Sequence, residues 1–144
     1  MYLFAIMDLY SRYVITWQLS NTLDTLFCLE GLERALQQGK PDIFHSDRGV
    51  QFTSHQFTDR LQKSQVLISM TGKGRCMDNI LVERLWRTLQ YEDIYLKDYP
   101  TIPALHSGLG DYFYFYAYQR LHQSLDYRTP AEIYLGHNAL FPVA

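Results

Sequence analysis

Apolar and polar positions alternate in a strand-like way at the start of the chain. Residues 2–7 form a continuous apolar run of strand length, and apolar side chains take every second position from residue 13 to residue 19. The polar residues Ser11 and Arg12 lie between the two segments. This pattern predicts a β-hairpin.

A helical pattern follows the hairpin. From about residue 22, leucines recur at the spacing of one helix face, at positions 26, 29, 32 and 36, and the segment Gly39-Lys40-Pro41 is expected to end the helix. Ile43 and Phe44 then lead into Asp47 and Gly49. A buried strand that ends in an acidic residue and a glycine turn commonly presents a side chain at the edge of an α/β sheet. We therefore expect Asp47 to lie where functional sites are often found.

The second half of the chain is predicted to be mainly helical. We expect a polar helix over residues 54–64, a strand over 66–70 and an irregular glycine-rich loop over 71–75. Asp78 is predicted to cap a helix that carries Glu83 on the flank of an apolar stripe formed by Val82, Leu85, Trp86 and Leu89. After Pro100 and Pro103 we expect a long helix with apolar positions as far as Leu121, and a last helical turn through residues 130–135.

Composition limits the class of protein. With 144 residues and 47% hydrophobic content, the chain suits one globular domain over residues 1–144, and neither a repeat nor a linker is evident. Its net charge of −2 is unlike that of a free-standing nucleic-acid-binding domain. Cys28 and Cys76 lack metal-site spacing, and neither a membrane span nor a leader is recognisable, so a cytoplasmic, membrane-free protein is expected.

Two carboxylates carry the candidate chemistry. Between Asp47 and Glu83 lie 83 − 47 − 1 = 35 residues, the first at a predicted strand end and the second on a predicted helix. Carboxylates brought together repel one another unless a divalent cation lies between them, and oxygen ligands favour Mg²⁺ or Mn²⁺. Two such ions would suit phosphoryl transfer. The alternatives are a turn aspartate for Asp47 and a helix-surface pair with Arg87 for Glu83.

Five ordered motifs resemble those of bacterial insertion-sequence transposases with a retroviral-integrase-like DDE core. The motifs are Asp8-Leu9-Tyr10-Ser11-Arg12, then His45-Ser46-Asp47-Arg48-Gly49-Val50-Gln51-Phe52-Thr53-Ser54, then Lys73-Gly74-Arg75-Cys76-Met77-Asp78-Asn79 with Glu83, then Tyr118-Gln119-Arg120-Leu121-His122-Gln123-Ser124-Leu125, and finally Tyr127-Arg128-Thr129-Pro130-Ala131-Glu132. The resemblance covers almost the whole chain.

The resemblance implies an α/β RNase H-like fold, a mixed sheet flanked by helices with a C-terminal helical extension. Asp47 and Glu83 would be the second and third of three metal-binding acids in a two-metal site. The family's first acid lies on an opening central strand that no residue here matches, because Asp8 corresponds to an aspartate of the next strand. We therefore expect an N-terminally truncated chain that is catalytically inert and poorly stable on its own.

The expected partners follow from the same resemblance. They are DNA, as insertion-sequence ends and target, and a full-length transposase or further copies of this chain. Basic side chains close to Glu83 in sequence, namely Lys73, Arg75, Arg84 and Arg87, would contact DNA phosphates or simply be solvated.

Two rival functions stay open at this stage. One is a metal-dependent nuclease of the same fold, in which Asp8, Asp47 and Glu83 form the acidic set. The other is a non-enzymatic remnant that pairs with full-length transposase and modulates it. Two further interpretations concern the C-terminal part: the aromatic run 112–116 favours core packing over base stacking, and His122 has either a structural or a DNA-backbone role.

Overall fold

The computed structural model describes residues 2–22, 24–70, 80–94 and 97–136. The chain divides into two compact units. The first, here called the N-terminal unit, comprises residues 1–6 and 15–80, and the second, the C-terminal unit, comprises residues 7–14 and 81–144.

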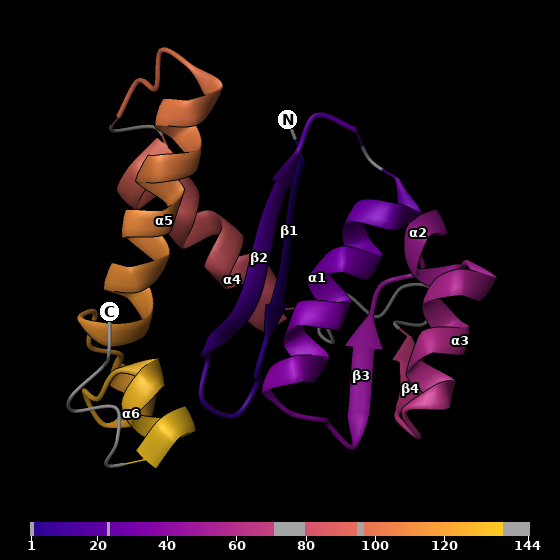
Figure 1. The fold of residues 1–144 in the computed structure, drawn as a ribbon. Coiled ribbons are helices and arrows are strands. Elements are labelled where there is room, and N and C mark those ends of the chain that lie inside the picture. The colour runs from indigo at the N-terminus through magenta and orange to yellow at the C-terminus, as the bar shows by residue number, and fades with distance from the viewer. Residues whose placement is uncertain (1, 23, 71–79, 95–96, 137–144) are drawn as a thin grey trace. The chain divides into compact units, whose positions relative to one another are not determined.

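The N-terminal unit opens with most of the predicted hairpin, whose turn, residues 7–14, is assigned to the C-terminal unit. Strands β1 (Tyr2–Met7) and β2 (Val14–Ser20) pair with one another. They lie side by side in Figure 1. The connection, residues 8–13, is far too short for the crossover that a parallel pair would need, so the pairing is antiparallel. The hairpin prediction is therefore confirmed.

Helices and two more strands complete this unit. They are α1 (Thr25–Gln38), β3 (Ile43–Ser46), α2 (Val50–Thr53), α3 (His55–Lys63) and β4 (Leu67–Met70). Among the described residues, the four strands form two separate two-stranded sheets, β1-β2 and β3-β4. β3 and β4 run parallel, with Ile43 opposite Leu67 and Ser46 opposite Met70.

The core of the N-terminal unit is built by apolar faces of β1, α1 and α3. Its buried members are Phe4, Phe27, Cys28, Leu32, Phe57, Leu61 and Val66. Gly31 of α1 lies against the Phe4 ring, and a Cβ added at Gly31 would overlap that ring. Helix α1 therefore packs directly on strand β1, and a side chain at position 31 would separate them.

The ends of α1 follow from local chemistry. The Asp24 side chain accepts a hydrogen bond of 2.9 Å from the backbone N–H of Phe27, which satisfies one of the free amides at the helix start. Gly39 forms the C-terminal cap, as the breaker segment predicted. The helix begins at Thr25, slightly later than the expected residue 22, because Asp24 and not Thr22 provides the cap.

One expectation about β3 is wrong. A buried strand was predicted, yet Ile43 is 58% exposed, while Phe44 packs against the core. Successive side chains of a strand point to opposite faces. Because Ile43 is exposed and the other three residues of β3 are partly buried, the strand is half-buried rather than buried.

The C-terminal unit is helical, as expected. It contains α4 (Ile80–Leu89), the π-helix η2 (Gln90–Ile94), α5 (Ile102–Tyr118), the 3₁₀ turn η3 (Gln123–Leu125) and α6 (Pro130–Leu135), which Figure 1 shows in the rose to yellow part of the chain. The predicted last helical turn is confirmed, with the Thr129 hydroxyl accepting from the Glu132 N–H at 3.2 Å. The two short segments η2 and η3 were not predicted.

The aromatic run of α5 packs mainly inward. Tyr112, Phe113 and Tyr116 are buried, whereas Tyr114 and Phe115 are exposed. Core packing therefore accounts for three of the five rings. The expected extension of this helix to Leu121 is wrong, because α5 ends at Tyr118 and Leu121 is exposed. Within the parts of the chain that the structure describes, no helix is long and apolar enough to span a bilayer.

Candidate active site

Asp47 directly follows the carboxyl end of β3. Its side chain is exposed, and its Oδ1 accepts a hydrogen bond of 2.8 Å from the backbone N–H of Gly49. That bond tightens the turn between β3 and α2, since Gly49 is the N-cap residue of α2. The strand thus places the Asp47 carboxylate at the sheet edge, where the sequence predicted it. One oxygen of this carboxylate, Oδ1, also stabilises the turn by accepting the hydrogen bond from Gly49.

Glu83 lies in the first turn of α4 and is exposed. Leu85 and Leu89 on the same helix are buried, while Val82 and Trp86 are half-buried. The apolar stripe therefore faces inward and leaves Glu83 on its flank, as the helical spacing predicted. Asp78, the predicted cap of this helix, lies outside the described residues.

Asp8 is held in the turn between β1 and β2. Its Oδ2 accepts hydrogen bonds from the backbone N–H and the hydroxyl of Ser11. Its backbone N–H donates to the carbonyl of Tyr13 at 2.8 Å, and its carbonyl accepts from Arg12 at 2.8 Å. These bonds give Asp8 a structural task in closing the hairpin.

No group of three His, Cys, Asp or Glu side chains that could hold a metal ion occurs in the described part of the chain. Asp47 and Glu83 belong to different units. They are oxygen donors of the kind that Mg²⁺ and Mn²⁺ bind, so the donor chemistry fits a divalent cation. By themselves, however, the two carboxylates make an incomplete ligand set.

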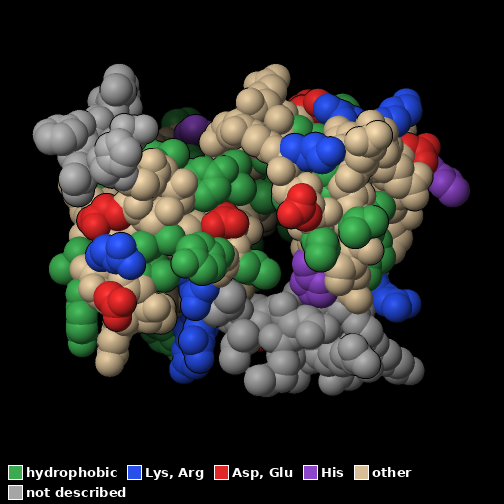
Figure 2. Space-filling view, turned by 90° about the horizontal axis from the view of Figure 1, so that it is seen from below, with side chains coloured by type: hydrophobic (Ala, Val, Ile, Leu, Met, Phe, Trp, Pro, Cys, Tyr) green, Lys and Arg blue, Asp and Glu red, His purple; other side chains and the backbone are tan. Residues whose placement is uncertain are grey.

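The structure describes two of the four basic residues that were predicted to contact DNA. Arg84 and Arg87 are exposed on α4, and the guanidinium of Arg87 lies 5.8 Å from the centre of the Tyr91 ring. Lys73 and Arg75 lie outside the described residues. Figure 2 shows one face of the molecule, on which described Lys and Arg side chains stand in small groups among acidic and apolar ones.

A polar network near the end of α5 was missed by sequence reasoning. Glu92 of η2 accepts hydrogen bonds from Arg120 at 2.9 Å and from the Tyr112 hydroxyl at 2.8 Å. Burial would by itself raise the pKa of Glu92, but the bonds from Arg120 and Tyr112 outweigh it and lower this pKa. Arg120 belongs to one of the five sequence motifs, which was the available signal for this network.

His122 lies beside this network. It is buried, its Nδ1 lies 3.4 Å from Nη1 of Arg120, and its ring packs edge-on against Tyr116. Burial, reinforced by the nearby Arg120 charge, lowers the pKa of His122. These surroundings support the structural interpretation of this histidine.

Comparison with known proteins defines the class. Residues 1–76 match a family model described as integrase core domain, and residues 64–130 match a second model of the same description. The first match covers more than half of the 144 residues, so the chain belongs to the integrase core family. This confirms the resemblance and, with it, the expected RNase H-like α/β fold.

The relatives are insertion-sequence transposases. The transposase of IS629 from Shigella sonnei is 29% identical over 91% of this chain and 45% of its own length. The putative transposase InsK of IS150 from Escherichia coli K12 is 30% identical over 92% of this chain and 48% of its own length. The chain thus spans about half the length of these curated relatives.

A solved structure supports the fold independently. The HTLV-2 integrase catalytic core domain, determined in complex with magnesium in a dimeric form, matches with a TM-score of 0.67. The two chains share 20% sequence identity, and the match covers 89% of this chain and 80% of the other. At this identity the likeness concerns the fold alone.

Proposed function

We propose that this chain contributes to DNA transposition by a metal-dependent phosphoryl transfer at insertion-sequence ends, with target DNA as the second substrate. The observation that carries the proposal is Asp47, an exposed carboxylate at the end of β3 inside a segment that resembles a motif of insertion-sequence transposases. Glu83, exposed on α4 inside the next motif, would be its partner. The proposal assigns both residues to metal binding.

The chemistry needs no covalent bond between protein and DNA. A water or a DNA 3′-hydroxyl oxygen forms a bond to phosphorus, the bond to the leaving oxygen breaks, and the attacking group loses its proton. Mg²⁺ or Mn²⁺ ions would activate the attacking oxygen and stabilise the leaving one. Asp47 and Glu83 would hold these ions, and the exposed Arg84 and Arg87 would contact DNA phosphates. The net charge of −2 means that such contacts must be local.

We further propose that the chain is inert by itself, because two carboxylates supply too few ligands for a two-metal site. The chain incubated with Mn²⁺ and insertion-end DNA should yield no joined product. A product that disappears in the Asp47→Ala variant would contradict this proposal. Activity would instead need the complete acidic set or pairing with a full-length transposase or a second copy.

The roles of Asp47 and Glu83 are best tested in a complete protein. In the IS150 transposase, the stretch that matches this chain would be replaced by this chain, and strand transfer by the hybrid would be measured with Mg²⁺. We expect Asp47→Asn and Glu83→Gln each to lower the rate at least about a hundredfold, since each removes a metal ligand.

Matched controls remove the same charge elsewhere. Asp59→Asn on α3 and Glu30→Gln on α1 alter residues that lie in neither motif, and their rates should stay within about twofold of the unchanged hybrid. If the Asp47 and Glu83 variants behaved like these controls, the assignment of metal ligands would be wrong. Cleavage of plain duplex DNA by the chain alone, lost in Asp8→Asn, would instead favour the nuclease.

A further inference from the structure

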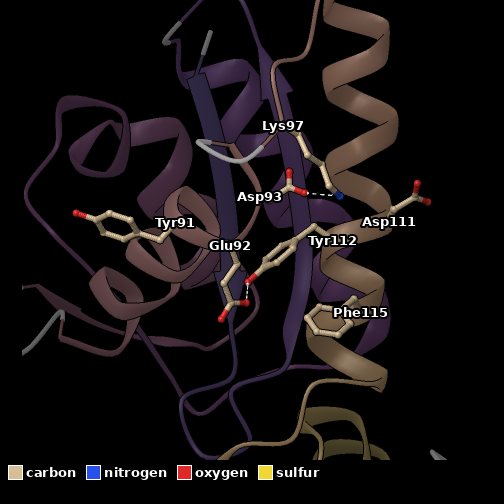
Figure 3. A pocket seen from close by; sticks show the side chains of 7 residues that line it. All are labelled: Tyr91, Glu92, Asp93, Lys97, Asp111, Tyr112 and Phe115. Atoms are coloured by element: carbon tan, nitrogen blue, oxygen red, sulfur yellow. Dashed lines mark hydrogen bonds and ion pairs between the residues drawn. The ribbon is translucent and has the colours of Figure 1, made fainter.

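The C-terminal unit contains a pocket whose lining includes neither Asp47 nor Glu83. Its volume is about 450 Å³, within the range of sites that bind small ligands or a protruding side chain. The side chains come from η2, Lys97 and α5, as Figure 3 shows. The lining residues are Tyr91, Glu92, Asp93, Lys97, Asp111, Tyr112 and Phe115.

Asp93 is the unusual member of this lining. It is completely buried, although a buried carboxylate is costly unless it is fully paired. Its Oδ2 accepts a hydrogen bond of 2.6 Å from the Tyr99 hydroxyl. The Tyr99 ring is placed there by Gly108 of α5, where a Cβ would lie 2.3 Å from the ring. Asp93 is therefore held rigidly on one side.

The other oxygen of Asp93 is only partly satisfied. Oδ1 is buried and has no hydrogen-bond partner among the described residues. The Nζ atom of Lys97 lies 3.0 Å from Oδ1, close enough for an ion pair but without the geometry of a hydrogen bond. A dashed line in Figure 3 marks this ion pair. The Lys97 side chain is 59% exposed. The rigid, buried carboxylate of Asp93 thus faces the ammonium group of Lys97, which sits on a long and largely exposed side chain. Another cation can therefore replace the Lys97 ammonium.

The other residues that line the pocket indicate which kind of cation it would bind. Phe115 and Tyr112 contribute aromatic surface, and the Tyr112 hydroxyl is already bonded to Glu92. Glu92 is neutralised by Arg120, so among the described lining residues Lys97 is the one cation left to balance Asp93 and Asp111. An excess of negative charge beside aromatic rings favours a cation with a flat, weakly hydrated face. A guanidinium has this form and can donate several hydrogen bonds to carboxylates.

We propose that this pocket binds the arginine side chain of a partner polypeptide, with Lys97 as the resident cation that the arginine displaces. The pocket volume is far larger than a bare metal ion requires, and the described residues offer no group of three metal ligands. A side chain enters such a pocket with its apolar stem against Phe115 and its guanidinium at Asp93. The site is independent of Asp47 and Glu83, so its failure would leave the proposed function untouched.

Binding of N-acetyl-arginine amide to the chain tests the proposal, with N-acetyl-citrulline amide as the uncharged probe of the same shape. Isothermal titration should show saturable binding of the arginine probe only. Free arginine should bind more weakly, because its carboxylate is repelled by the pocket. The Lys97→Met variant should bind the arginine probe about tenfold more tightly, since the competing ammonium is gone. Asp111→Asn should weaken binding about twofold to fivefold.

Asp59→Asn, which removes the same charge from α3, should leave the affinity unchanged. Lys97→Met leaves the Asp93 charge without a counter-ion and can lower stability, so its melting temperature is measured with and without the probe. A larger rise in melting temperature for Lys97→Met and Lys97→Gln than for the unchanged chain is expected. Equal binding of the arginine and citrulline probes, or an affinity unaffected by both Lys97 variants, would overturn the proposal.

Discussion

His122 combines burial with a close positive neighbour. Burial of the imidazole and the charges of Arg120 and Arg12 disfavour its protonation, while the Tyr116 backbone and the Glu92 carboxylate favour it. The result is a pKa below the value of about 6.5 expected for an unfolded chain. The neutral form therefore suits the folded state, and stability is linked to pH through this residue.

We predict that the free energy of unfolding falls as pH decreases below about 6.5. The reason is that His122 becomes protonated at a higher pH in the unfolded chain than in the folded chain. The stabilising contribution of neutral His122 is fully present above the pKa of His122 in the unfolded chain. It is lost as the pH falls through the lower pKa of His122 in the folded chain. Urea unfolding of the unchanged chain and of His122→Gln at pH 7, 6 and 5 measures it. The difference between the two proteins should shrink with decreasing pH.

His55→Gln is the matched control. His55 is exposed on α3, so its replacement should leave the pH dependence of unfolding as it is. If His122→Gln and His55→Gln changed the pH dependence equally, burial of His122 would not be the cause.

At the scale of single residues, exposed groups in motifs were predictable and buried polar groups were not. Asp47 and Glu83 stand in recognisable segments, and their exposure follows from a strand end and a helix flank. Asp93 stands in no motif, and its burial depends on Tyr99 and on Gly108, which lie later in the chain. Sequence periodicity carries no information about such a contact.

At the scale of elements, the hydrophobic pattern predicted most helices and strands. The pattern gave wrong element ends where tertiary packing, and not the local sequence, determines where a helix ends. The π-helix η2 interrupts what the pattern would treat as the simple end of α4, and it brings Glu92 to Arg120 and Asp93 to Tyr99. The end of α5 was placed too late because Leu121 fits the helical spacing although it is exposed. The spacing of apolar residues identifies the apolar face of a helix. It does not show at which residue the rest of the protein ceases to cover that face.

The contact of α1 with β1 gives a prediction at this scale. Gly31→Ala should lower the free energy of unfolding by about 1–3 kcal/mol, because the new methyl group would overlap the buried Phe4 ring and force it to move. Chemical denaturation monitored by circular dichroism measures this change.

Gly39→Ala is its control on the same helix. An added Cβ at Gly39 meets nothing within 4 Å, and the residue has an extended backbone with φ of 167°. Its effect should stay within about 0.5 kcal/mol. A Gly31→Ala variant as stable as Gly39→Ala would show that α1 and β1 are less closely packed than described.

At the scale of the whole molecule, the strands among the described residues form two small sheets instead of one. Small sheets have a large share of edges, and strand edges tend to pair with other chains. Ile43 and Leu67 lie opposite one another in β3 and β4 and are 58% and 68% exposed. Exposed apolar side chains at a strand pair make self-association the main hazard for the isolated chain.

We predict that the chain self-associates at concentrations of tens of micromolar and that Ile43→Lys reduces this association several-fold, because a charge at a strand edge opposes pairing. Size-exclusion chromatography with light scattering measures the mass distribution. Leu26→Lys, at an equally exposed position on α1, should have little effect. Equal effects of the two lysines would point to general solubility and not to strand pairing.

The sequence by itself determined the family, the hairpin, most of the helices and the two candidate metal ligands, because these depend on local periodicity, capping residues and ordered motifs. The prediction of one domain stays a prediction. Only the tertiary structure decided that β3 is half-buried, that Asp8 closes a turn, and that Asp93 lies buried beside Lys97 and Tyr99. Those features depend on which distant segments cover a residue, and burial and pairing of this kind arise only when the chain is folded.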